Sequence, residues 1–463
     1  MFRTRLLPSS TLHPAAILPP QLRLSSRLYL SAKTMSQHQS YLVVGAGVFG
    51  ATTALELKRQ FPEARVTLLD RVNFPSPSAA SHDVNKIIRA DYGDILYMKL
   101  ALEAQTLWRT DPIYKPYYHE TGMLYAENTG LGKSFIENYK TLGFQHASEL
   151  ISPPDAKERF GAFKDANWTG VTDTYFNPKS AWGDGAGALK SVIEAAINCG
   201  VEFKAAPVAK LSIKGSKNCV GVVLEDSTEL QADKVIVAMG AWTPTFLAES
   251  AIDCESLLAG DRMIAAGAIQ CCATVPPEHS DLFKSSPVMV NLMDHTIGEC
   301  IPPTEDGKIK FNYEVSFTNN LLHQPSGKVI SVPPSRPSRS TWGQDVPQGL
   351  KDEIHTVMRH IYGHRVKLLK IEGYRMCWDS VTPNQDWIIA RHPQVNSLYF
   401  ATGGSFHSWK FMPTIGRYVV QMVKGELSDE LSSRWAWDRP TDGGALPEYL
   451  PKRDLKDIAG YSE

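Results

Sequence analysis

The chain has 463 residues and a formal net charge of -1, with 43% hydrophobic and 21% charged residues. A chain of this length exceeds one compact hydrophobic core, so we expect two domains. The near-neutral charge lacks the basic field with which proteins bind nucleic acids, so no nucleic-acid partner is expected. Apolar runs of about eighteen residues without charges are absent from the sequence, so no membrane span is expected.

The first 40 residues differ in composition from the rest of the chain. They contain five basic and no acidic residues, which leaves 43 basic and 49 acidic residues in the remainder. This composition, rich in Arg, Ser and Leu, is typical of an organellar transit peptide. A second interpretation starts translation at Met35 and leaves a cytosolic protein. We therefore expect a cytoplasmic or mitochondrial protein that is not secreted, with 1–40 as a transit peptide or disordered leader.

The seven cysteines form neither a C-x-x-C pair nor the regular spacing of a disulfide framework or zinc site. Their odd number suits a reducing compartment, and most are expected to be small buried hydrophobic residues. No metal site is predicted.

The first predicted structural unit in chain order is a nucleotide-binding loop. An apolar strand at 41–44 leads into Gly45, Gly47 and Gly50 with the spacing G-x-G-x-x-G, and a helix-like segment follows. In this context the first glycine permits a tight turn, the second lets the backbone approach a pyrophosphate, and the third lets helix and sheet pack. The amides at the start of the helix would bind the phosphate oxygens.

A second strand at 65–69 ends at Asp70, about twenty residues after the glycine motif. A carboxylate at this place binds a ribose hydroxyl, which favours FAD or NAD over NADP. The alternative is a glycine-rich loop without a ligand. The dinucleotide-binding residues predicted for this unit are Gly45, Gly47, Val48, Phe49, Gly50, Asp70 and Arg71.

Strands of the same kind recur far along the chain. A helical pattern at 186–196 leads into a strand at 201–203, and apolar strands at 235–238 and 398–402 end at glycine-rich turns. This arrangement predicts an α/β fold with one Rossmann-like domain assembled from discontinuous segments, beside an α+β substrate domain with a mixed or antiparallel sheet. The predicted segments are a leader at 1–40, the dinucleotide-binding domain at 41–95, 186–250 and 366–445, the substrate domain at 96–185 and 251–365, and a C-terminal tail at 446–463.

Three further motifs carry a family resemblance. They are Ser-His-Asp-Val-Asn-Lys-Ile-Ile-Arg-Ala-Asp-Tyr-Gly at 81–93, Arg-Met-Cys-Trp at 375–378 and Gly-Ser-Phe-His-Ser-Trp-Lys-Phe at 404–411. With the glycine motif, they resemble the FAD-dependent amine oxidases of the D-amino acid oxidase superfamily. The similar branch contains sarcosine, pipecolate, saccharopine and fructosyl amino acid oxidases, and the resemblance runs from about 41 to 425. It implies that the dinucleotide is FAD.

The motif at 375–378 resembles the covalent-flavin motif of the fructosyl amino acid and saccharopine types. In that family the cysteine corresponding to Cys377 forms a thioether to the flavin 8α-methyl group. The resemblance therefore implies 8α-S-cysteinyl FAD. Without the motif, a buried structural cysteine is the expected interpretation.

The resemblance assigns Arg89 and Lys410 to the substrate carboxylate. A planar guanidinium grips a carboxylate through two bonds, while an ammonium adds a point charge. Lys86 lies one helical turn before Arg89, where the family also has a base, and His82 and His407 are expected beside the flavin ring. Taken alone, each of the charged residues is typical of a solvated surface.

The strand around Lys310 resembles the segment that presents a lysine to the flavin N5 edge, where oxygen reacts. A fixed cation there would stabilise developing superoxide, and the alternative is a strand lysine that faces water. Glu314 follows at the spacing that fructosyl amino acid oxidases use for a substrate-binding carboxylate. The remaining predicted cofactor-binding residues are Ser81, His82, Val208, Gly240, Cys377, Gly404, Ser405, Phe406 and Lys410.

The C-terminal turn departs from the family pattern, which has smaller residues at the positions of Phe406 and Trp409. These two side chains are expected to narrow or reshape the pocket. A good fit of sarcosine, or of a bulky sugar adduct, is therefore not expected.

The sequence predicts an FAD-dependent oxidase that converts the carbon–nitrogen bond of a secondary amine amino acid to an imine and reduces O2 to hydrogen peroxide. The substrates considered are saccharopine, sarcosine, pipecolate and fructosyl amino acids. Alternatives are a cyclising amine oxidase of secondary metabolism, a mitochondrial amine dehydrogenase that uses an electron carrier, and a flavin-binding protein without turnover. The oligomeric state is not predicted.

Overall fold

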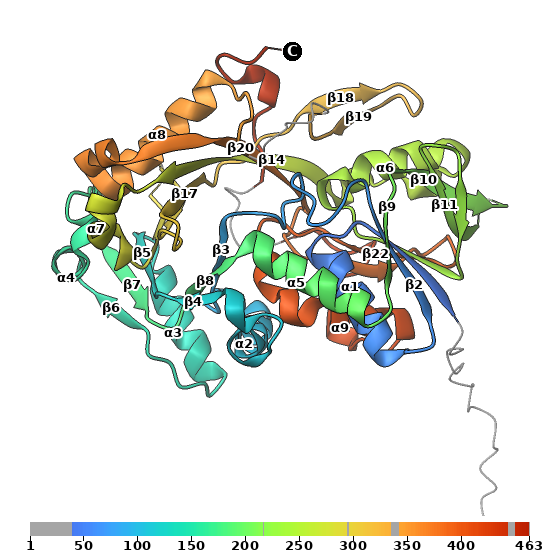
Figure 1. Cartoon of the computed structure of the whole chain (residues 1–463), viewed down its shortest axis with the longest axis horizontal. Helices are drawn as coiled ribbons and strands as arrows, with labels where there is room; N and C mark the ends of the chain where they lie inside the picture. The colour runs from blue at the N-terminus through green and yellow to red at the C-terminus, as the bar shows by residue number, and fades with distance from the viewer. Residues whose placement is uncertain (1–38, 216, 294–295, 335–341, 443–449, 463) are drawn as a thin grey trace, which may run out of the picture. The chain divides into compact units, whose positions relative to one another are not determined.

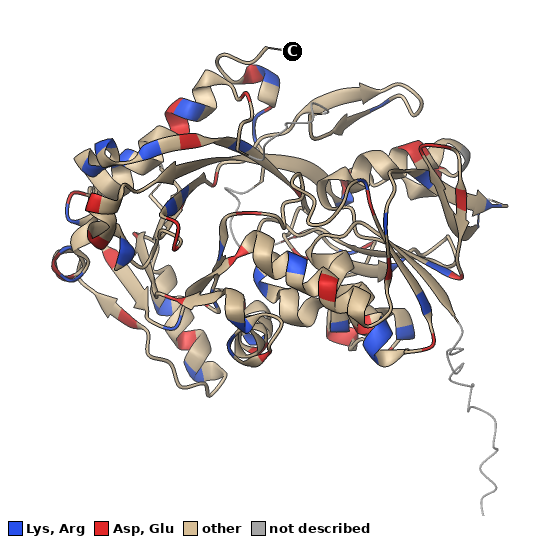
Figure 2. Ribbon diagram, in the orientation of Figure 1, with Lys and Arg blue, Asp and Glu red and all other residues tan. Residues whose placement is uncertain are grey.

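The computed structural model describes residues 39–215, 217–293, 296–334, 342–442 and 450–462. Residues 1–38 of the predicted leader lie outside the described residues. From Gln37 onward the chain forms one unit, and Figure 1 labels its elements. Figure 2 shows acidic and basic residues interspersed along these elements.

The first large sheet has the strand order β21-β22-β13-β1-β2-β9. Its strands run parallel except at β21, which pairs antiparallel with β22. The predicted strand at 41–44 becomes the fully buried central strand β1, as expected for a parallel sheet covered on both faces. The strands are β1 (Ser40–Val44), β2 (Arg65–Asp70), β9 (Glu202–Ala205), β13 (Lys234–Val237), β21 (Ile388–Arg391) and β22 (Leu398–Thr402).

Helices and a small sheet cover this first sheet. The helices α1 (Val48–Gln60), α5 (Gly185–Asn198) and α9 (Met412–Lys424) pack together and lie beside it (Figure 1). A hydrophobic cluster joins other strand residues to α6 (Thr243–Ser250) and to a three-stranded antiparallel sheet. That sheet consists of β10 (Val208–Lys214), β11 (Asn218–Leu224) and β12 (Glu229–Gln231).

The second large sheet has the order β20-β14-β17-β16-β15-β5-β7-β6 and is mixed, because β15 pairs parallel with β5 while the other neighbours are antiparallel. The predicted α/β fold class with mixed and antiparallel sheets is confirmed. The strands are β5 (Met123–Glu127), β6 (Glu149–Ile151), β7 (Asp173–Asn177), β14 (Ile264–Thr274), β15 (Val288–Asn291), β16 (Gly298–Ile301), β17 (Lys308–Tyr313) and β20 (Lys370–Val381).

Two smaller sheets and several helices complete the described elements. One sheet has the order β3-β8-β4, and β18 pairs with β19 in a hairpin. The strands are β3 (Asn85–Ile88), β4 (Tyr118–Glu120), β8 (Ala181–Asp184), β18 (Asn320–His323) and β19 (Lys328–Ser331). The helices are α2 (Ile95–Thr110), α3 (Leu131–Thr141), α4 (Pro153–Arg159), α7 (Ser280–Lys284), α8 (Gln348–Tyr362) and α10 (Asp429–Arg434).

Strand β20 lies in a different sheet from the one that its predicted segment suggests. It pairs antiparallel with β14 from Lys370 to Val381 and so belongs to the eight-stranded sheet. The predicted boundary at 366 groups this segment with the dinucleotide-binding domain instead. The backbone pairing with β14 decides the sheet, and no local sequence signal reports a partner about 100 residues away. The division into two domains stays a prediction.

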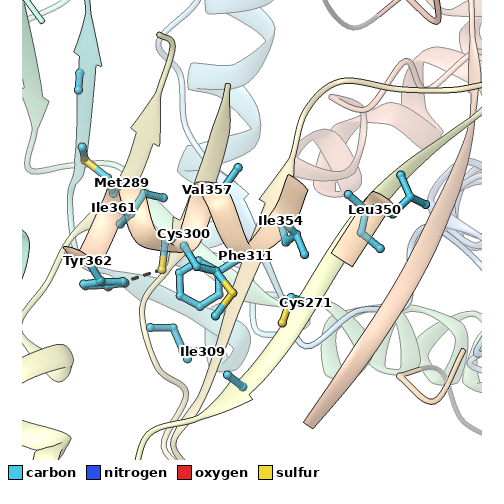
Figure 3. Packing of buried hydrophobic residues seen from close by; sticks show 14 of the residues in the cluster. Cys271, Met289, Cys300, Ile309, Phe311, Leu350, Ile354, Val357, Ile361 and Tyr362 are labelled. Atoms are coloured by element: carbon cyan, nitrogen blue, oxygen red, sulfur yellow. Dashed lines mark hydrogen bonds between the residues drawn. The ribbon is translucent and has the colours of Figure 1, made fainter. Parts of the chain in front are cut away.

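Helix α8 forms the hydrophobic cover of the eight-stranded sheet. Figure 3 shows Leu350, Ile354 and Val357 of this helix facing residues of β14, β16 and β17. At one end of the cluster, the Cys300 thiol lies 3.5 Å from the Tyr362 hydroxyl. The apolar stripe along α8 follows the spacing of a helix that buries one face.

Truncation of Ile354 tests this packing, because its side chain is fully buried (0% exposed). We expect Ile354→Ala to lower the free energy of unfolding by ~2–5 kcal/mol and Ile354→Val by ~0.5–1.5 kcal/mol. Leu322→Ala, at a position 53% exposed, is the control and should change it by less than ~0.5 kcal/mol. Denaturant unfolding measures all three. Equal effects at the buried and the exposed position would contradict the packing.

Candidate active site

The carboxyl ends of the parallel strands β1, β2 and β13 open onto a cavity of about 690 Å3. Residues of β14, β16, β17 and β20 from the second large sheet form its other side. Ligands of open α/β sheets bind at this edge of the strands, and the volume lies in the range of small-molecule and cofactor sites.

The glycine loop lies at one end of the cavity. Gly45 has a φ of +103°, and a Cβ there would lie 2.4 Å from the Ala238 carbonyl oxygen. The Val48 amide at the start of α1 donates to the Ser81 hydroxyl over 2.8 Å. A Cβ at Gly47 would approach the same hydroxyl to 3.2 Å, so a larger residue there would crowd the Ser81 side chain.

Asp70 closes the loop from the end of β2. Its carboxylate accepts hydrogen bonds from the amides of Ala46 (2.9 Å) and Arg71 (2.8 Å). Burial raises the pKa of Asp70, although these amides and the Arg71 charge oppose the rise. The Arg71 guanidinium lies 4.1 Å over the Trp242 ring. Both Asp70 and Arg71 line the cavity, so a carboxylate and a cation face the same end as the glycine loop.

A buried ionic network around Asp83 lies behind the cavity wall, and both of its lysines, Lys86 and Lys310, line the cavity. The Lys310 ammonium, on a side chain that is 1% exposed, lies 2.7 Å from the Asp83 carboxylate and donates to the Asn85 carbonyl over 2.5 Å. The Lys86 ammonium lies 3.0 Å from the same Asp83 oxygen. One buried carboxylate therefore serves two lysines from different elements.

The pKa values of this network follow from burial and charge. Burial alone would raise the pKa of Asp83, but Lys310 and Lys86 outweigh burial and hold it well below its usual range. Burial lowers the pKa of Lys310 despite the attraction of Asp83. For Lys86 burial acts in the same direction, but Asp83 prevails and its pKa is raised.

Arg89 and Lys410 are a second pair of cations in the lining of the cavity. The Lys410 ammonium donates to the Tyr92 hydroxyl over 3.1 Å and to the His407 carbonyl over 2.9 Å. The Arg89 guanidinium lies 4.3 Å over the Tyr92 ring and donates to the Asp91 carbonyl. Burial and the Arg89 charge lower the pKa of Lys410 well below its usual value. An anion would relieve this repulsion.

His407 is neutral beside these cations. Burial and the Lys410 charge lower its pKa to about 3. Its Nε2 donates to the Gln385 carbonyl over 2.8 Å, and its Nδ1 lies 3.3 Å from the Tyr92 hydroxyl. These bonds suit a fixed, neutral ring that shapes the pocket.

Cys377 reaches the cavity from β20, where it is the register partner of Ala268 on β14. The turn that follows β22 is fixed next to it. The Phe406 amide donates to the Asp379 carboxylate over 2.9 Å, and Ser405 and Phe406 have φ values of 48° and 61°. Burial raises the pKa of Asp379.

Most of the residues predicted from the sequence line this cavity. They are Gly45, Gly47, Val48, Phe49, Asp70, Arg71, Ser81, Lys86, Arg89, Val208, Gly240, Lys310, Glu314, Cys377, Phe406, His407, Trp409 and Lys410. The predicted residues outside the lining are Gly50, His82, Gly404 and Ser405.

The four predicted residues outside the lining shape the backbone around the cavity, through close approaches or backbone hydrogen bonds. A Cβ at Gly50 would lie 1.8 Å from the Gly45 carbonyl oxygen, and one at Gly404 would lie 2.8 Å from the Asp379 carboxylate. Ser405 is 1% exposed, and its hydroxyl accepts from the Thr382 amide over 3.2 Å. The His82 carbonyl accepts from the Arg375 guanidinium over 2.5 Å.

The expectation that Lys86 lies one helical turn before Arg89 is wrong. Asn85–Ile88 form strand β3, which pairs antiparallel with β8. Adjacent β-branched residues, Ile87 and Ile88, favour the extended form. Three residues of strand span about 10 Å, about twice the pitch of a helical turn.

Sequence reasoning missed Asp83, Arg375, Glu299 and Asn312 as cavity or support residues. Asp83 and Arg375 stand inside the recognised motifs, so their position was a usable signal. Glu299 and Asn312 are register partners on β16 and β17, and only the strand pairing brings Glu299 to the site.

Comparison with known proteins identifies the family. The model described as "FAD dependent oxidoreductase", DAO, matches residues 40–422. The chain belongs to this family. FAD is therefore its cofactor, and the chain is an oxidoreductase.

Its similarities extend over most of the chain. L-saccharopine oxidase of Schizosaccharomyces pombe (strain 972 / ATCC 24843) is 28% identical over 420 residues, which cover 86% of this chain and 93% of that protein. Monomeric sarcosine oxidase of Bacillus sp. (strain NS-129) is 23% identical over 412 residues, covering 86% and 96%. The structure of fructosyl peptide oxidase from E. terrenum superposes with a TM-score of 0.78 at 27% identity, covering 93% and 99%.

The residues of the cavity fit FAD. The open glycine loop, the start of α1 and the carboxylate of Asp70 suit a dinucleotide at one end. Cys377 and the two cationic groups lie along the rest of the same cavity. Among the described residues, no group of metal-binding side chains was found, and no helix is long and apolar enough to cross a membrane.

Asp83→Asn tests the shared carboxylate. We expect the free energy of unfolding to fall by ~3–5 kcal/mol, because the buried lysines lose their counter-charge. Removal of Asp83 lowers the pKa of Lys310 further, so the folded variant binds fewer protons than the unfolded chain. The difference in free energy of unfolding between the wild-type protein and Asp83→Asn should therefore shrink as the pH rises toward the ordinary lysine pKa of ~10.4.

Unfolding between pH 7 and pH 10 measures this effect. Asp306→Asn is the matched control, since Asp306 pairs with Lys308 at the surface, with side chains 63% and 48% exposed. The control substitution should lower the free energy of unfolding only slightly at any pH. A loss of stability for Asp83→Asn that grows with pH would contradict the role of Asp83 as the counter-charge of the lysines.

Proposed function

We propose that the chain oxidises a secondary amine derived from an amino acid and reduces O2 to hydrogen peroxide, with its FAD linked covalently through Cys377. The observation that carries this proposal is the cavity of an FAD-dependent oxidoreductase whose lining contains both the half-buried Arg89 and the buried Lys410. The relatives named as saccharopine, sarcosine and fructosyl peptide oxidases support the substrate class.

Arg89 and Lys410 bind the substrate carboxylate. The guanidinium is positioned by the Tyr92 ring and the Asp91 carbonyl, and the ammonium by the Tyr92 hydroxyl. Both cations are fixed before the substrate arrives, so little reorganisation is needed. An anchored carboxylate holds the adjacent carbon–nitrogen bond in one orientation, which makes the reaction effectively intramolecular.

The reaction balances as a two-electron oxidation. The carbon next to nitrogen loses a hydride, the nitrogen loses a proton, and the product is an imine, which water splits into a carbonyl compound and an amine. Bound FAD supplies the acceptor for the two electrons, and O2 takes them up with two protons to give hydrogen peroxide. The neutral ring of His407 and the aromatic side chains of Phe406 and Trp409 line the pocket around the substrate.

Lys310 holds a positive charge near the reacting atoms. Its ammonium is fixed by Asp83 and the Asn85 carbonyl rather than by water. A preorganised cation in a buried site stabilises negative charge that develops on oxygen. Lys86 shares the Asp83 carboxylate and belongs to the same support.

Cys377 would hold FAD through a thioether to the flavin 8α carbon. Formation of this bond would remove one hydrogen from the thiol and one from the methyl group, and O2 would take up both with their two electrons as hydrogen peroxide. Access of Cys377 to the cavity supports this step. The remaining proposed contacts of FAD are those predicted from the glycine loop, Asp70 and Arg71, with Ser81, Val208 and Gly240.

The same proposal includes a cytoplasmic or mitochondrial location. All seven cysteines are free, and six of them are buried. Unpaired cysteines suit a reducing compartment.

Removal of either cation should weaken binding of the carboxylate. We expect Arg89→Met and Lys410→Met each to reduce kcat/KM for an N-methyl amino acid roughly 30-fold to several-thousand-fold. This range corresponds to a loss of about 2–5 kcal/mol in stabilisation of the transition state. An amine of the same shape without a carboxylate is the control substrate and should lose far less. Steady-state kinetics with peroxide detection measures both. Equal losses for the two substrates would argue against carboxylate binding.

Cys377→Ser tests the covalent link. After denaturing precipitation, the wild-type pellet should retain the yellow flavin, and the variant should release it into the supernatant. Cys272→Ser, at another buried cysteine outside the cavity lining, is the matched control and should retain it. Free flavin from the wild-type protein would contradict the link.

The number of peroxide molecules formed per substrate molecule oxidised should be close to one. A low peroxide yield, with turnover that rises when an artificial electron acceptor is added, would favour a dehydrogenase.

A further inference from the structure

Asp91 is a fully buried carboxylate (0% exposed) outside the lining of the cavity. It follows strand β3, two residues after Arg89 and directly before Tyr92. Four buried side chains donate hydrogen bonds to its two oxygens. Oδ1 accepts from the hydroxyls of Tyr175 (2.5 Å) and Tyr139 (3.1 Å) and from the amide Nδ2 of Asn177 (2.8 Å), and Oδ2 accepts from the hydroxyl of Ser180 (2.9 Å).

The donors to Asp91 come from three separate parts of the fold. Tyr139 belongs to α3, Tyr175 and Asn177 belong to β7 of the eight-stranded sheet, and Ser180 precedes β8. Burial and the charge of Asp91 raise the pKa of both tyrosines, so their hydroxyls keep the protons that they donate. A buried carboxylate needs such donors in place of water. The Asp91 side chain therefore fixes its own backbone to α3 and to the second large sheet.

The backbone at Asp91 and Tyr92 supports both cations of the cavity. The Arg89 guanidinium donates to the Asp91 carbonyl and lies 4.3 Å over the Tyr92 ring. The Lys410 ammonium donates to the Tyr92 hydroxyl over 3.1 Å. Asn138 of α3 holds the same stretch, since its Nδ2 donates to the Tyr92 carbonyl over 2.9 Å. A shift of this backbone would move the supports of both cations together.

We propose that the Asp91 carboxylate is a positioning residue for the Arg89–Lys410 pair. Its four hydrogen bonds fix residues 91–92, and these residues fix the two cations. The role extends to Tyr139 and Tyr175, which lie outside the cavity lining. This inference rests on the proposed binding of the substrate carboxylate by Arg89 and Lys410, and it adds the part of the protein that sets their geometry. A misplacement of about 1 Å far from the chemistry can lower the rate about 100-fold.

Two other roles of the carboxylate make different predictions. In a purely structural role, loss of the carboxylate lowers stability and leaves the preference for a substrate carboxylate unchanged. In a purely electrostatic role, the negative charge of Asp91 weakens the binding of an anion nearby, so its removal tightens that binding. A positioning role predicts weaker binding of the substrate carboxylate when the hydrogen bonds are lost. The direction of the effect therefore separates the three roles.

Asp91→Ala and Asp91→Asn test the positioning role in the flavin-loaded enzyme. The asparagine Oδ1 can keep the three hydrogen bonds of the Asp91 Oδ1, and its Nδ2 can donate to the Ser180 hydroxyl, whereas alanine keeps none. The measured quantity is the ratio of kcat/KM for an N-methyl amino acid to that for an amine of the same shape without a carboxylate. We expect Asp91→Ala to lower this ratio by about 10- to 100-fold. Asp91→Asn should stay within about threefold of the wild-type ratio, because it keeps the hydrogen bonds without the charge.

Glu127→Ala is the matched control, because Glu127 is also a buried carboxylate (0% exposed) that accepts four hydrogen bonds. Its donors are Thr129, Leu131 and Gly132 at the start of α3. Like Asp91→Ala, this variant should lower the free energy of unfolding, but it should keep the wild-type ratio. Flavin content and denaturant unfolding verify that each variant is folded.

Two further measurements keep the test decisive if Asp91→Ala does not fold. Tyr175→Phe removes a single donor and should lower the ratio by about threefold, with flavin content unchanged. Binding of 2-hydroxyhexanoate, followed by the change in flavin absorbance, needs no turnover. Its Kd should rise in Tyr175→Phe and stay at the wild-type value in Glu127→Ala.

Three outcomes would overturn the positioning role: a wild-type ratio in folded Asp91→Ala or Tyr175→Phe, equal losses in Asp91→Asn and Asp91→Ala, or tighter binding of 2-hydroxyhexanoate to the variants. Failure of the proposed function looks different. In that case no amine is oxidised, or Arg89→Met loses activity equally with both substrates. If only the positioning role fails, Arg89→Met keeps its carboxylate-specific loss while Asp91→Ala shows none.

Discussion

The buried carboxylate of Asp83 is the interaction on which the cavity depends. It lies in the segment that connects the first sheet to β3, and it binds Lys310 on β17 of the second sheet. Two hydrogen bonds from Arg375 on β20 fix the carbonyls of Ala79 and His82 in the same segment. The Ser81 hydroxyl accepts from the Val48 amide at the glycine loop. Residues 79–85 thus form a strap between the two sheets, and the cavity lies along it.

This strap relates the structure of the site to its chemistry. A lysine as deeply buried as Lys310 needs a counter-charge, because desolvation favours its neutral form. Asp83 supplies that charge and fixes the ammonium at the same time. The same bonds that hold the sheets together therefore also set the position of the cation proposed to act on oxygen. A change in the strap would alter stability and reactivity together.

The parts of the site that follow local rules could be predicted from the sequence. The glycine spacing around Gly45 and the distance to Asp70 are consequences of one strand, one turn and one helix, and such short-range geometry is encoded within a few residues. The motif containing Cys377 was equally local. Pairing between distant strands was not readable: β20 joins β14, and Glu299 meets Asn312, through backbone hydrogen bonds that carry no residue signature. The spacing of three residues between Lys86 and Arg89 fits a helical turn as well as a strand, so the spacing alone does not predict strand β3.

The charged groups of the cavity differ in how their desolvation cost is offset. Lys310 and Lys86 share the Asp83 carboxylate within the protein, so no ligand is needed to neutralise them. The groups at either side are different: Arg89 and Lys410 repel each other, and Glu299 raises the pKa of Glu314. Like charges held together in a low-dielectric site shift each other's pKa toward the neutral form, and a ligand of opposite sign favours the charged form again. A carboxylate bound by Arg89 and Lys410 would favour the charged form of Lys410, so binding of an anion and protonation of this lysine are linked.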